Sequence, residues 1–371
     1  DIYDWTQVFH SLPLKDIPKT SGKNLSFFDD WMKHPSYDEY WKTLAIKERY
    51  SDIKIPILQI GGWYDFFTAG TLNNFVGMKE NGGSELARKY QRAIMGPWTH
   101  SFVGKLTYAG NTDYSSTASI DLLEIELAWF DHWLKEVQNE AELEPPLKLF
   151  IMGSNKWRDE FEWPLKRTSF TSWYFHSNGN ANSAAGFGTL SAEKPDKETP
   201  DHFTYNPMFP VPTKGGCNCC DPHIIPWGSY DQRDVEARSD VLVYTSAELD
   251  KPMEVTGPIT VKLFASSDCL DTDFTAKLVD VYPDGRALNL CDGIIRARYR
   301  NSTETAELLE PNKIYEFTID LWPTSNLFKK GHKIRVDISS SNFPRFDRNT
   351  NTGLNINSDS ELKIAKQTVY H

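Results

Sequence analysis

Apolar residues in the first part of the chain follow the order of an α/β protein. Residues 53–60 are a short, nearly continuous apolar run that leads into Gly61, and a shorter apolar run ends residues 90–95, the second predicted strand, before Gly96. Such runs are typical of strands that are buried on both faces of a parallel sheet. Between them, residues 71–79 place apolar side chains on one helical face. The pattern predicts two parallel strands joined by a right-handed helical crossover.

Helical segments are expected on both sides of this unit. Residues 1–52 are rich in aromatic and polar side chains with poor periodicity, which favours short helices joined by loops. In residues 119–138 the apolar side chains recur at steps of three and four, which predicts a long amphipathic helix that closes the first domain. The apolar positions of this helix are Ile120, Leu123, Leu127, Phe130, Leu134 and Val137.

The pattern changes after residue 146. Short runs of alternating apolar and polar residues follow, separated by turn residues: 148–151, 172–175, 240–244, 259–263, 315–321 and 333–338. Alternation of this kind is typical of strands with one packed and one solvated face. The second part is therefore predicted to be an all-β sandwich, with a long polar excursion over residues 177–214.

Composition excludes several classes of protein. The 371 residues exceed what one hydrophobic core usually serves, and 39% hydrophobic with 25% charged residues is typical of a folded globular chain. The net charge of −11, with Lys and Arg scattered among Asp and Glu, gives no electrostatic basis for nucleic-acid binding. No apolar run approaches the length that spans a membrane. The odd number of cysteines, 5, argues against a disulfide framework.

Two titratable residues follow the two predicted strands. Asp65 comes shortly after the first strand and His100 after the second, and the carboxyl ends of parallel strands meet at one edge of a sheet. A carboxylate that orients an imidazole forms two thirds of a hydrolytic triad, and Asp before His is the order of the α/β-hydrolases. The sequence contains no G-x-S-x-G nucleophile motif. On spacing alone, the alternative is that Asp65 is a loop or cap residue and that His100 is a surface histidine.

Longer motifs extend this hypothesis. Residues 61–65 (GGWYD) and 96–100 (GPWTH) resemble the acid and histidine motifs of the cocaine esterase-like hydrolases. That family includes α-amino-acid ester hydrolases, glutaryl acylases and X-prolyl dipeptidyl peptidases. The segments 231–242, 271–274, 280–285, 331–335 and 341–349 resemble the jelly-roll domain of the same family.

The resemblance implies a fold and a division of the chain. Residues 1–142 are expected to be the C-terminal part of an α/β-hydrolase domain, with the end of a helical cap over about 1–50. Residues 143–371 are expected to be a jelly-roll β-sandwich. The family's serine motif and its oxyanion-hole tyrosine lie upstream of any matched segment, so we expect the chain to lack the first half of the hydrolase domain and a short tail. The incomplete sheet is then expected to expose strand edges and apolar surface.

The resemblance also implies roles and partners. Asp65 corresponds to the triad acid, His100 to the general base, and Phe67 to a residue lining the acyl pocket. The substrate class is a small acyl ester, an amide or a short peptide, and no cofactor, nucleic acid or membrane is implied. The nucleophilic serine is absent from this chain, and a separate N-terminal fragment is one source of it. Trp63 and Trp98 are expected to pack the two loops against the sheet.

Three further clusters are interpreted as structural. Cys217, Cys219, Cys220 and His223 lack the paired spacing of a zinc site, so free or locally paired thiols are expected. Asp268, Asp271 and Asp273 lack a calcium-loop pattern, which favours a solvated strand edge. His332 begins an alternating strand and is expected to be structural.

The sequence also allows a second hypothesis about the function. In it the jelly roll binds a peptide or carbohydrate, the α/β part is a scaffold, and no catalysis takes place. A serine motif encoded upstream in the parent gene would favour the hydrolase.

Overall fold

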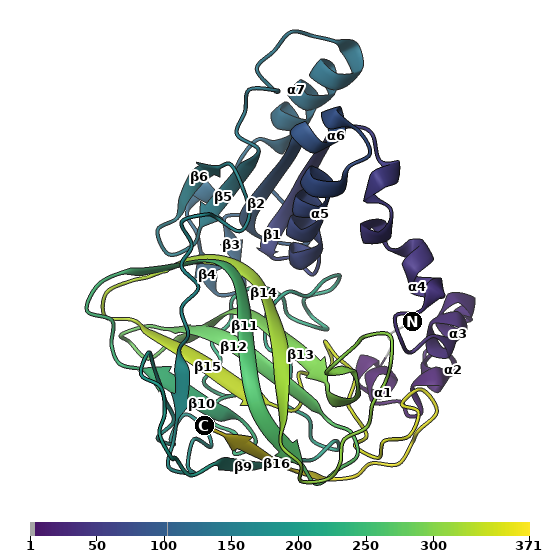
Figure 1. Ribbon diagram of the computed structural model, residues 1–371, viewed down its shortest axis with the longest axis vertical. Helices are drawn as coiled ribbons and strands as arrows, with labels where there is room; N and C mark the ends of the chain where they lie inside the picture. Colours follow the sequence, from purple (N-terminus) through teal and green to yellow (C-terminus); the bar gives the residue numbers. More distant parts are fainter. Residues whose placement is uncertain (1–3, 102) are drawn as a thin grey trace.

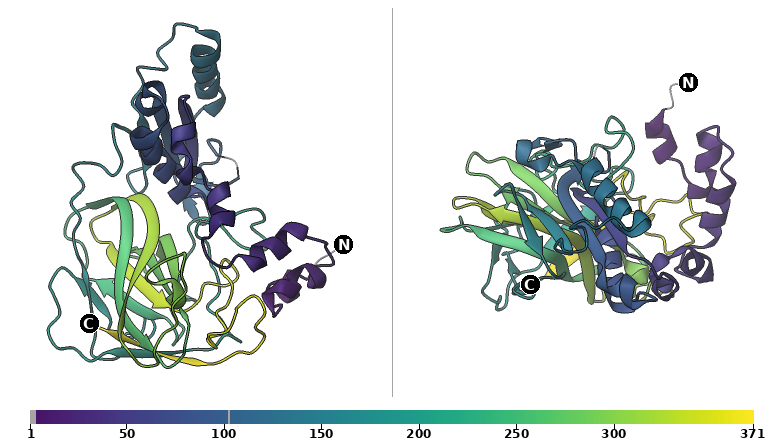
Figure 2. Two further views of the ribbon diagram at one scale, coloured as in Figure 1. Left: turned by 45° about the vertical axis from the view of Figure 1, so that its right-hand side comes forward. Right: turned by 90° about the horizontal axis from the view of Figure 1, so that it is seen from above.

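The computed structural model describes residues 4–101 and 103–371. A small α/β part lies above a larger β-sandwich, and the N-terminal helices extend along one side of both (Figure 1). The same arrangement is visible in the left view of Figure 2, and the right view shows from above that the N-terminal helices lie to one side. Within the described residues, no helix combines the length and apolarity needed to cross a membrane.

The α/β part is built on a four-stranded sheet with the order β1-β2-β5-β6. Its strands are β1 (Ile57–Tyr64), β2 (Gln91–Thr99), β5 (Leu147–Ile151) and β6 (Lys156–Glu160). The strands β1 and β2 are parallel, and the crossover between them holds α5 (Thr68–Asn81) and α6 (Glu85–Lys89), which confirms the predicted unit. A two-stranded ribbon, β3 (Tyr108–Ala109) with β4 (Thr112–Asp113), follows β2.

The strand predicted over residues 148–151 lies in a different sheet from the one expected. It is β5, which pairs with β2 in parallel, rather than a strand of the sandwich. Leu147, Leu149, Phe150 and Ile151 are all buried, as suits a strand inside an α/β layer. A run of four residues is too short for its pattern to show whether the strand is buried on both faces or on one face only. The division of the chain after residue 142 stays a prediction.

The predicted amphipathic helix is α7 (Leu122–Lys135), which begins and ends within the expected range. Its side chains Leu123, Leu127, Phe130 and Leu134 are 52–75% exposed in this chain. The apolar stripe that the sequence predicted is therefore present, but no described residue covers it. This bears out the expectation that apolar surface is exposed.

Short helices precede the sheet, as the sequence predicted. They are α1 (Trp5–Phe9), α2 (Ile17–Thr20), α3 (Ser26–Lys33) and α4 (Glu39–Leu44), with one-turn 3₁₀ segments at Leu14–Asp16, Ile46–Glu48 and Tyr50–Asp52. The segment that holds these helices contacts loops of the sandwich, and its last 3₁₀ turn contacts α5. The Lys15 amide donates to the Asn357 carbonyl at 3.1 Å, and the Tyr37 amide donates to the Thr303 carbonyl at 2.8 Å. The helical segment is thereby tied to the second part of the molecule.

The second part is a sandwich of two sheets, as predicted. One sheet has six strands in the order β13-β12-β15-β10-β8-β7, and the other has four in the order β14-β11-β16-β9. Their bounds are β7 (Tyr174–His176), β8 (Thr189–Ser191), β9 (Asp201–Tyr205), β10 (Leu242–Ser246), β11 (Met253–Ser267), β12 (Asp273–Val281), β13 (Ala287–Arg296), β14 (Tyr315–Phe328), β15 (Lys333–Ser339) and β16 (Ala365–Tyr370). Inward-facing side chains of both sheets meet in one core, where the rings of Phe274 and Phe317 lie 4.8 Å apart.

The two parts are joined by buried hydrogen bonds. The Met152 amide donates to the Ser325 carbonyl of β14 at 3.0 Å, and its carbonyl accepts from the Leu327 amide at 2.8 Å. The Tyr64 hydroxyl at the end of β1 donates to the main-chain oxygen of Asn289 in β13 at 3.1 Å. Burial raises the pKa of Tyr64 well above its ordinary value, so this hydroxyl keeps its proton.

One ion pair also bridges the two parts. Two guanidinium nitrogens of Arg158 in β6 donate to the two carboxylate oxygens of Glu254 in β11, at 2.7 and 2.9 Å. The hydrogen bonds from Arg158 lower the pKa of Glu254. A two-pronged pair of this kind has better-defined geometry than a single surface contact.

We predict that Glu254→Gln lowers the free energy of unfolding by about 0.5–1 kcal/mol near neutral pH, because the pair is about one third exposed and screened by solvent. The folded pKa lies below the unfolded one, so the stabilisation is present above the unfolded pKa and is lost as pH falls through the folded pKa. The difference between the two proteins in urea titrations should therefore shrink with acidification. Glu316→Gln, which breaks the more exposed pair with Lys262 at 3.1 Å, is the control. A pH-independent difference for Glu254→Gln would contradict the prediction.

Candidate active site

The parallel register of β1 and β2 brings the two predicted chemical residues together. Tyr64, the last residue of β1, pairs with Thr99, the last residue of β2. The next residues, Asp65 and His100, therefore leave the same edge of the sheet side by side. The Nδ1 atom of His100 lies 3.2 and 3.3 Å from the two carboxylate oxygens of Asp65.

The turn that begins α5 holds Asp65 in place. Its side chain is buried, and its Oδ1 accepts a hydrogen bond from the Phe67 amide at 2.8 Å. The Thr68 amide donates to the Asp65 carbonyl at 3.1 Å, and the Thr68 hydroxyl contacts the carbonyls of Gly62 and Asp65. The carboxylate is thus fixed by the main chain and directed at the imidazole.

His100 is fixed on one side and open on the other. Its side chain is 39% exposed, while that of Asp65 is 6% exposed. Within residues 4–101 and 103–371, Nε2 of His100 makes no hydrogen bond. An imidazole anchored through Nδ1 has Nε2 free to exchange a proton with another group.

Two aromatic rings lie against the imidazole. The ring of Phe66 is 4.6 Å from that of His100 in an edge-to-face arrangement, and the ring of Phe67 is 5.6 Å away. Phe67 is 54% exposed, so one side of its ring faces solvent beside the imidazole. Sequence reasoning missed Phe66, because two adjacent phenylalanines after a strand give no sign of which one packs on the histidine.

A glycine in each motif leaves room for Trp98: Gly62 of β1 lies against its main chain, and Gly96, in the same strand β2 as Trp98, lies against its ring. A Cβ on Gly62 would lie 2.2 Å from the Trp98 carbonyl oxygen, and one on Gly96 would lie 2.4 Å from the Trp98 ring. Trp63 and Trp98 are almost fully buried, and their indole nitrogens donate to the Phe150 and Ala118 carbonyls. The two tryptophans pack the strand ends against the core, as expected.

The cysteine cluster lies in the loop beside β1. The Cys217 thiol is buried 3.3 Å from the Trp63 carbonyl oxygen, and Cys219 and Cys220 form a disulfide. This arrangement agrees with the expectation of free and locally paired thiols. In the described part of the chain, no group of three or more His, Cys, Asp or Glu side chains is arranged to hold a metal ion.

The remaining clusters are engaged in internal pairs. Asp271 pairs with Arg298 at 2.7 Å and Asp273 with Arg296 at 3.0 Å, so these carboxylates are buried partners of arginines and not a solvated strand edge. The reason is that the following segment supplies both guanidinium groups. His332 is buried against Asp280 at 2.7 Å, which agrees with a structural role.

A mostly parallel sheet with an acid and a histidine at its carboxyl edge, joined to a β-sandwich, defines an α/β-hydrolase-like protein with a jelly-roll partner domain. Comparison with protein families gives the same class. Residues 139–371 match the X-Pro dipeptidyl-peptidase C-terminal non-catalytic domain, and residues 5–102 match the X-Pro dipeptidyl-peptidase S15 family. The chain belongs to the cocaine esterase-like and X-Pro dipeptidyl-peptidase-like hydrolase family.

Individual relatives and solved structures agree with this assignment. The chain is 42% identical to cocaine esterase of Rhodococcus sp. (strain MB1 Bresler) over 342 residues, which is 92% of this chain and 58% of that protein. It superposes with a TM-score of 0.83 on an aminopeptidase from a marine sediment archaeon, Thaumarchaeota archaeon, at 25% identity, covering 100% of this chain and 62% of that one. An α-amino acid ester hydrolase, 24% identical, has the same fold with a TM-score of 0.82, over 100% of this chain and 62% of that one. The chain thus spans about three fifths of the length of these proteins.

We predict that Gly62→Ala lowers the free energy of unfolding by about 1–3 kcal/mol, because a methyl group there meets a main-chain oxygen that cannot move without separating β1 from β2. Denaturant titration monitored by tryptophan fluorescence measures the change. Gly70→Ala is the matched control, since a Cβ there meets nothing within 4 Å. Its helical position should make alanine neutral or stabilising by up to about 1 kcal/mol. Equal effects of the two substitutions would contradict the close-approach argument.

We predict that the three free cysteines, Cys217, Cys269 and Cys291, do not react with a thiol reagent in the native protein. Burial raises the pKa of the Cys217 thiol to about 12 and that of Cys269 to about 11, and it raises that of Cys291 as well. Almost no thiolate is then present at pH 8. All three should react after unfolding in guanidinium chloride, with two more after reduction of the disulfide. A thiol that reacts rapidly in the unreduced native protein would contradict the prediction, because it would show that at least one of these cysteines is accessible.

Proposed function

We propose that this chain supplies the acid and the general base of a serine hydrolase that cleaves small acyl esters, amides or short peptides. The observation that carries the proposal is the Asp65–His100 pair at the carboxyl edge of the sheet, with Nδ1 on the carboxylate and Nε2 unpaired within the described residues. The serine is proposed to come from residues outside this chain, in a preceding segment or a separate fragment.

The proposed reaction proceeds through an acyl-enzyme. The Nε2 atom of His100 accepts the proton of the serine hydroxyl as its oxygen forms a bond to the carbonyl carbon of the substrate. The same nitrogen then gives this proton to the leaving alcohol or amine as the bond to that group breaks. A water molecule attacks the acyl-enzyme in the same way and releases the acid. Asp65 stays ionised, orients the imidazole and stabilises its protonated form throughout.

The substrate class is supported by the site and by the relatives. Phe67 is proposed to contact the acyl group, because its half-exposed ring lies 5.6 Å from the imidazole. The similar proteins named above are an esterase, an α-amino acid ester hydrolase and an aminopeptidase, and these names denote cleavage of esters or peptides. Both an ester and a peptide substrate are therefore included in the test.

The test uses the complete protein that carries this sequence, with a p-nitrophenyl ester and an X-Pro p-nitroanilide as substrates. Asp65→Asn should lower kcat about 10⁴-fold, because the imidazole loses its orienting charge, and His100→Ala should lower it about 10⁶-fold. A serine-directed fluorophosphonate should label the native protein and label the His100→Ala variant far more slowly.

The control is Asp52→Asn, which changes an exposed carboxylate paired with Arg49 and should leave kcat unchanged. Folding of each variant is checked by its urea midpoint. The proposal is wrong if the well-folded Asp65→Asn or His100→Ala variant keeps the activity of the unaltered protein. It is also wrong if neither substrate is hydrolysed and no chain takes the fluorophosphonate, which would leave the jelly-roll ligand-binding hypothesis.

A further inference from the structure

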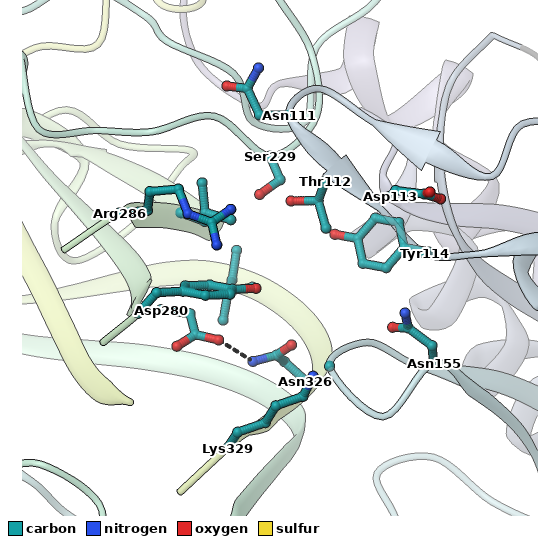
Figure 3. Close-up of a pocket in the computed structure, with 14 residues that line it drawn as sticks. Asn111, Thr112, Asp113, Tyr114, Asn155, Ser229, Asp280, Arg286, Asn326 and Lys329 are labelled. Atoms are coloured by element: carbon teal, nitrogen blue, oxygen red, sulfur yellow. Dashed lines mark hydrogen bonds between the residues drawn. The ribbon is translucent and has the colours of Figure 1, made fainter. Parts of the chain in front are cut away.

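A cavity of about 250 Å³ lies where the α/β part meets the sandwich (Figure 3). One wall is formed by the β3–β4 ribbon and the turn between β5 and β6, and the other by β12, β13, β14 and the loops that follow β12 and β14. Asp65, His100 and Phe67 do not line it. The volume suits a small organic molecule, since it is several times the space that one water molecule occupies.

The floor of this seam cavity is a built polar site. Ser229, Asp280 and Asn326 line it and are each at most 3% exposed. Asp280 is fixed by Nδ1 of His332 at 2.7 Å, and the ring of Tyr282 lies 4.3 Å from the His332 ring. Charged and polar groups buried in this way hold fixed positions before any ligand arrives.

Buried hydrogen-bonding capacity on this floor is incompletely used. The second carboxylate oxygen of Asp280 has one long contact, 3.5 Å from the Asn326 amide nitrogen (Figure 3). The amide oxygen of Asn326 accepts no hydrogen bond from the described residues. These oxygens line the cavity with hydrogen-bonding capacity to spare, so they can accept from polar groups of a molecule or of water in it.

The rim of the cavity carries two cations that are available to a ligand. The Nε atom of Arg286 donates to Asp284 at 2.8 Å, and the guanidinium lies over the Tyr282 ring, 4.7 Å from its centre. Its terminal nitrogens make no hydrogen bond with a described residue and point across the cavity toward Ser229 and Thr112 (Figure 3). Lys329 makes no hydrogen bond or ion pair with any described residue. Terminal guanidinium nitrogens and an ammonium group together favour a carboxylate.

Acidic groups balance part of this charge. Asp284 is paired with Arg286 from outside the cavity, and Asp280, which is paired with His332, also lies within the electrostatic range of Lys329. The Asp113 carboxylate accepts from the Ser115 amide at 2.8 Å and points away from the cavity (Figure 3). The rim therefore offers a ligand the unused hydrogen-bond donors of two cationic side chains, while the buried Asp280 carboxylate disfavours a second negative charge deep in the cavity.

We propose that the seam cavity binds a small hydroxycarboxylate. The carboxylate contacts Arg286 and Lys329 at the rim, and the hydroxyl groups contact Asp280, Asn326 and Ser229 on the floor. Leu288 and Leu290, which also line the cavity, face the carbon chain. Hydroxyl groups suit this floor because each one both donates to a carboxylate or amide oxygen and accepts from a hydroxyl or amide nitrogen. A fatty acid lacks the hydroxyl groups, and a neutral sugar alcohol leaves both cations unused.

The experiment measures binding of gluconate to the purified protein by saturation-transfer NMR and calorimetry. Sorbitol has the same carbon chain and hydroxyl groups without the carboxylate, and hexanoate has the carboxylate without the hydroxyl groups. Gluconate should bind with a Kd of about 1 mM or lower, and each of the other two at least about tenfold more weakly. The variant Arg286→Gln/Lys329→Gln should weaken gluconate binding by about tenfold or more, because two charge-assisted hydrogen bonds are lost.

Arg286 and Lys329 are both exposed, so the double variant is expected to fold. Lys262→Gln, which removes a 68% exposed lysine of β11 away from the cavity, is the matched control and should bind gluconate as the unaltered protein does. The proposal is overturned if gluconate does not bind, or if the double variant binds it as tightly as the control. Equal binding of gluconate and hexanoate would also overturn it, because that result shows only general attraction of anions. None of these readouts depends on hydrolytic activity.

Discussion

The parallel pairing of β1 with β2 is the constraint on which the candidate site depends. Because both strands end at paired positions, Tyr64 and Thr99, the next residue of each chain segment leaves the sheet at the same edge. The separation of the two strands is set by glycine, since any side chain at Gly62 would meet the backbone of Trp98. The hydrogen bond between Asp65 and His100 is thus a consequence of main-chain geometry, and the two buried tryptophans keep that geometry rigid.

The sandwich takes part in holding this edge. Main-chain bonds of Met152 with β14 and the bond from Tyr64 to β13 connect the strands of the α/β sheet to both sheets of the second part. The core is correspondingly shared, since one buried cluster includes Trp63 from β1 and Phe317 from β14. The acid of the candidate site therefore rests on a core to which residues far along the sequence contribute.

Sequence patterns predicted those features that depend on local periodicity. The strand–helix–strand unit, the amphipathic helix, the alternating strands and the pair Asp65–His100 all follow from short apolar runs and the residues that end them. The position of β5 did not follow, because Leu147 to Ile151 is too short to show whether one face or both are buried. The edge-to-face contact of Phe66 with His100 depends on side-chain rotamers. The seam cavity combines segments that are separated by more than two hundred residues, so no local pattern could indicate it.

The hydrogen bonds at Tyr64 also bear on how such a protein can change in evolution. The Tyr114 hydroxyl donates to that of Tyr64 at 3.1 Å, and Tyr64 donates in turn to the Asn289 main-chain oxygen. The last acceptor belongs to the backbone, so this contact is preserved by the path of β13 and not by the identity of a side chain. Recombination that exchanged the sandwich between relatives would keep the support beneath Asp65 only if that path were retained. Any side chain at position 289 would leave this acceptor in place, so the contact tolerates sequence change in the sandwich as long as its fold is kept.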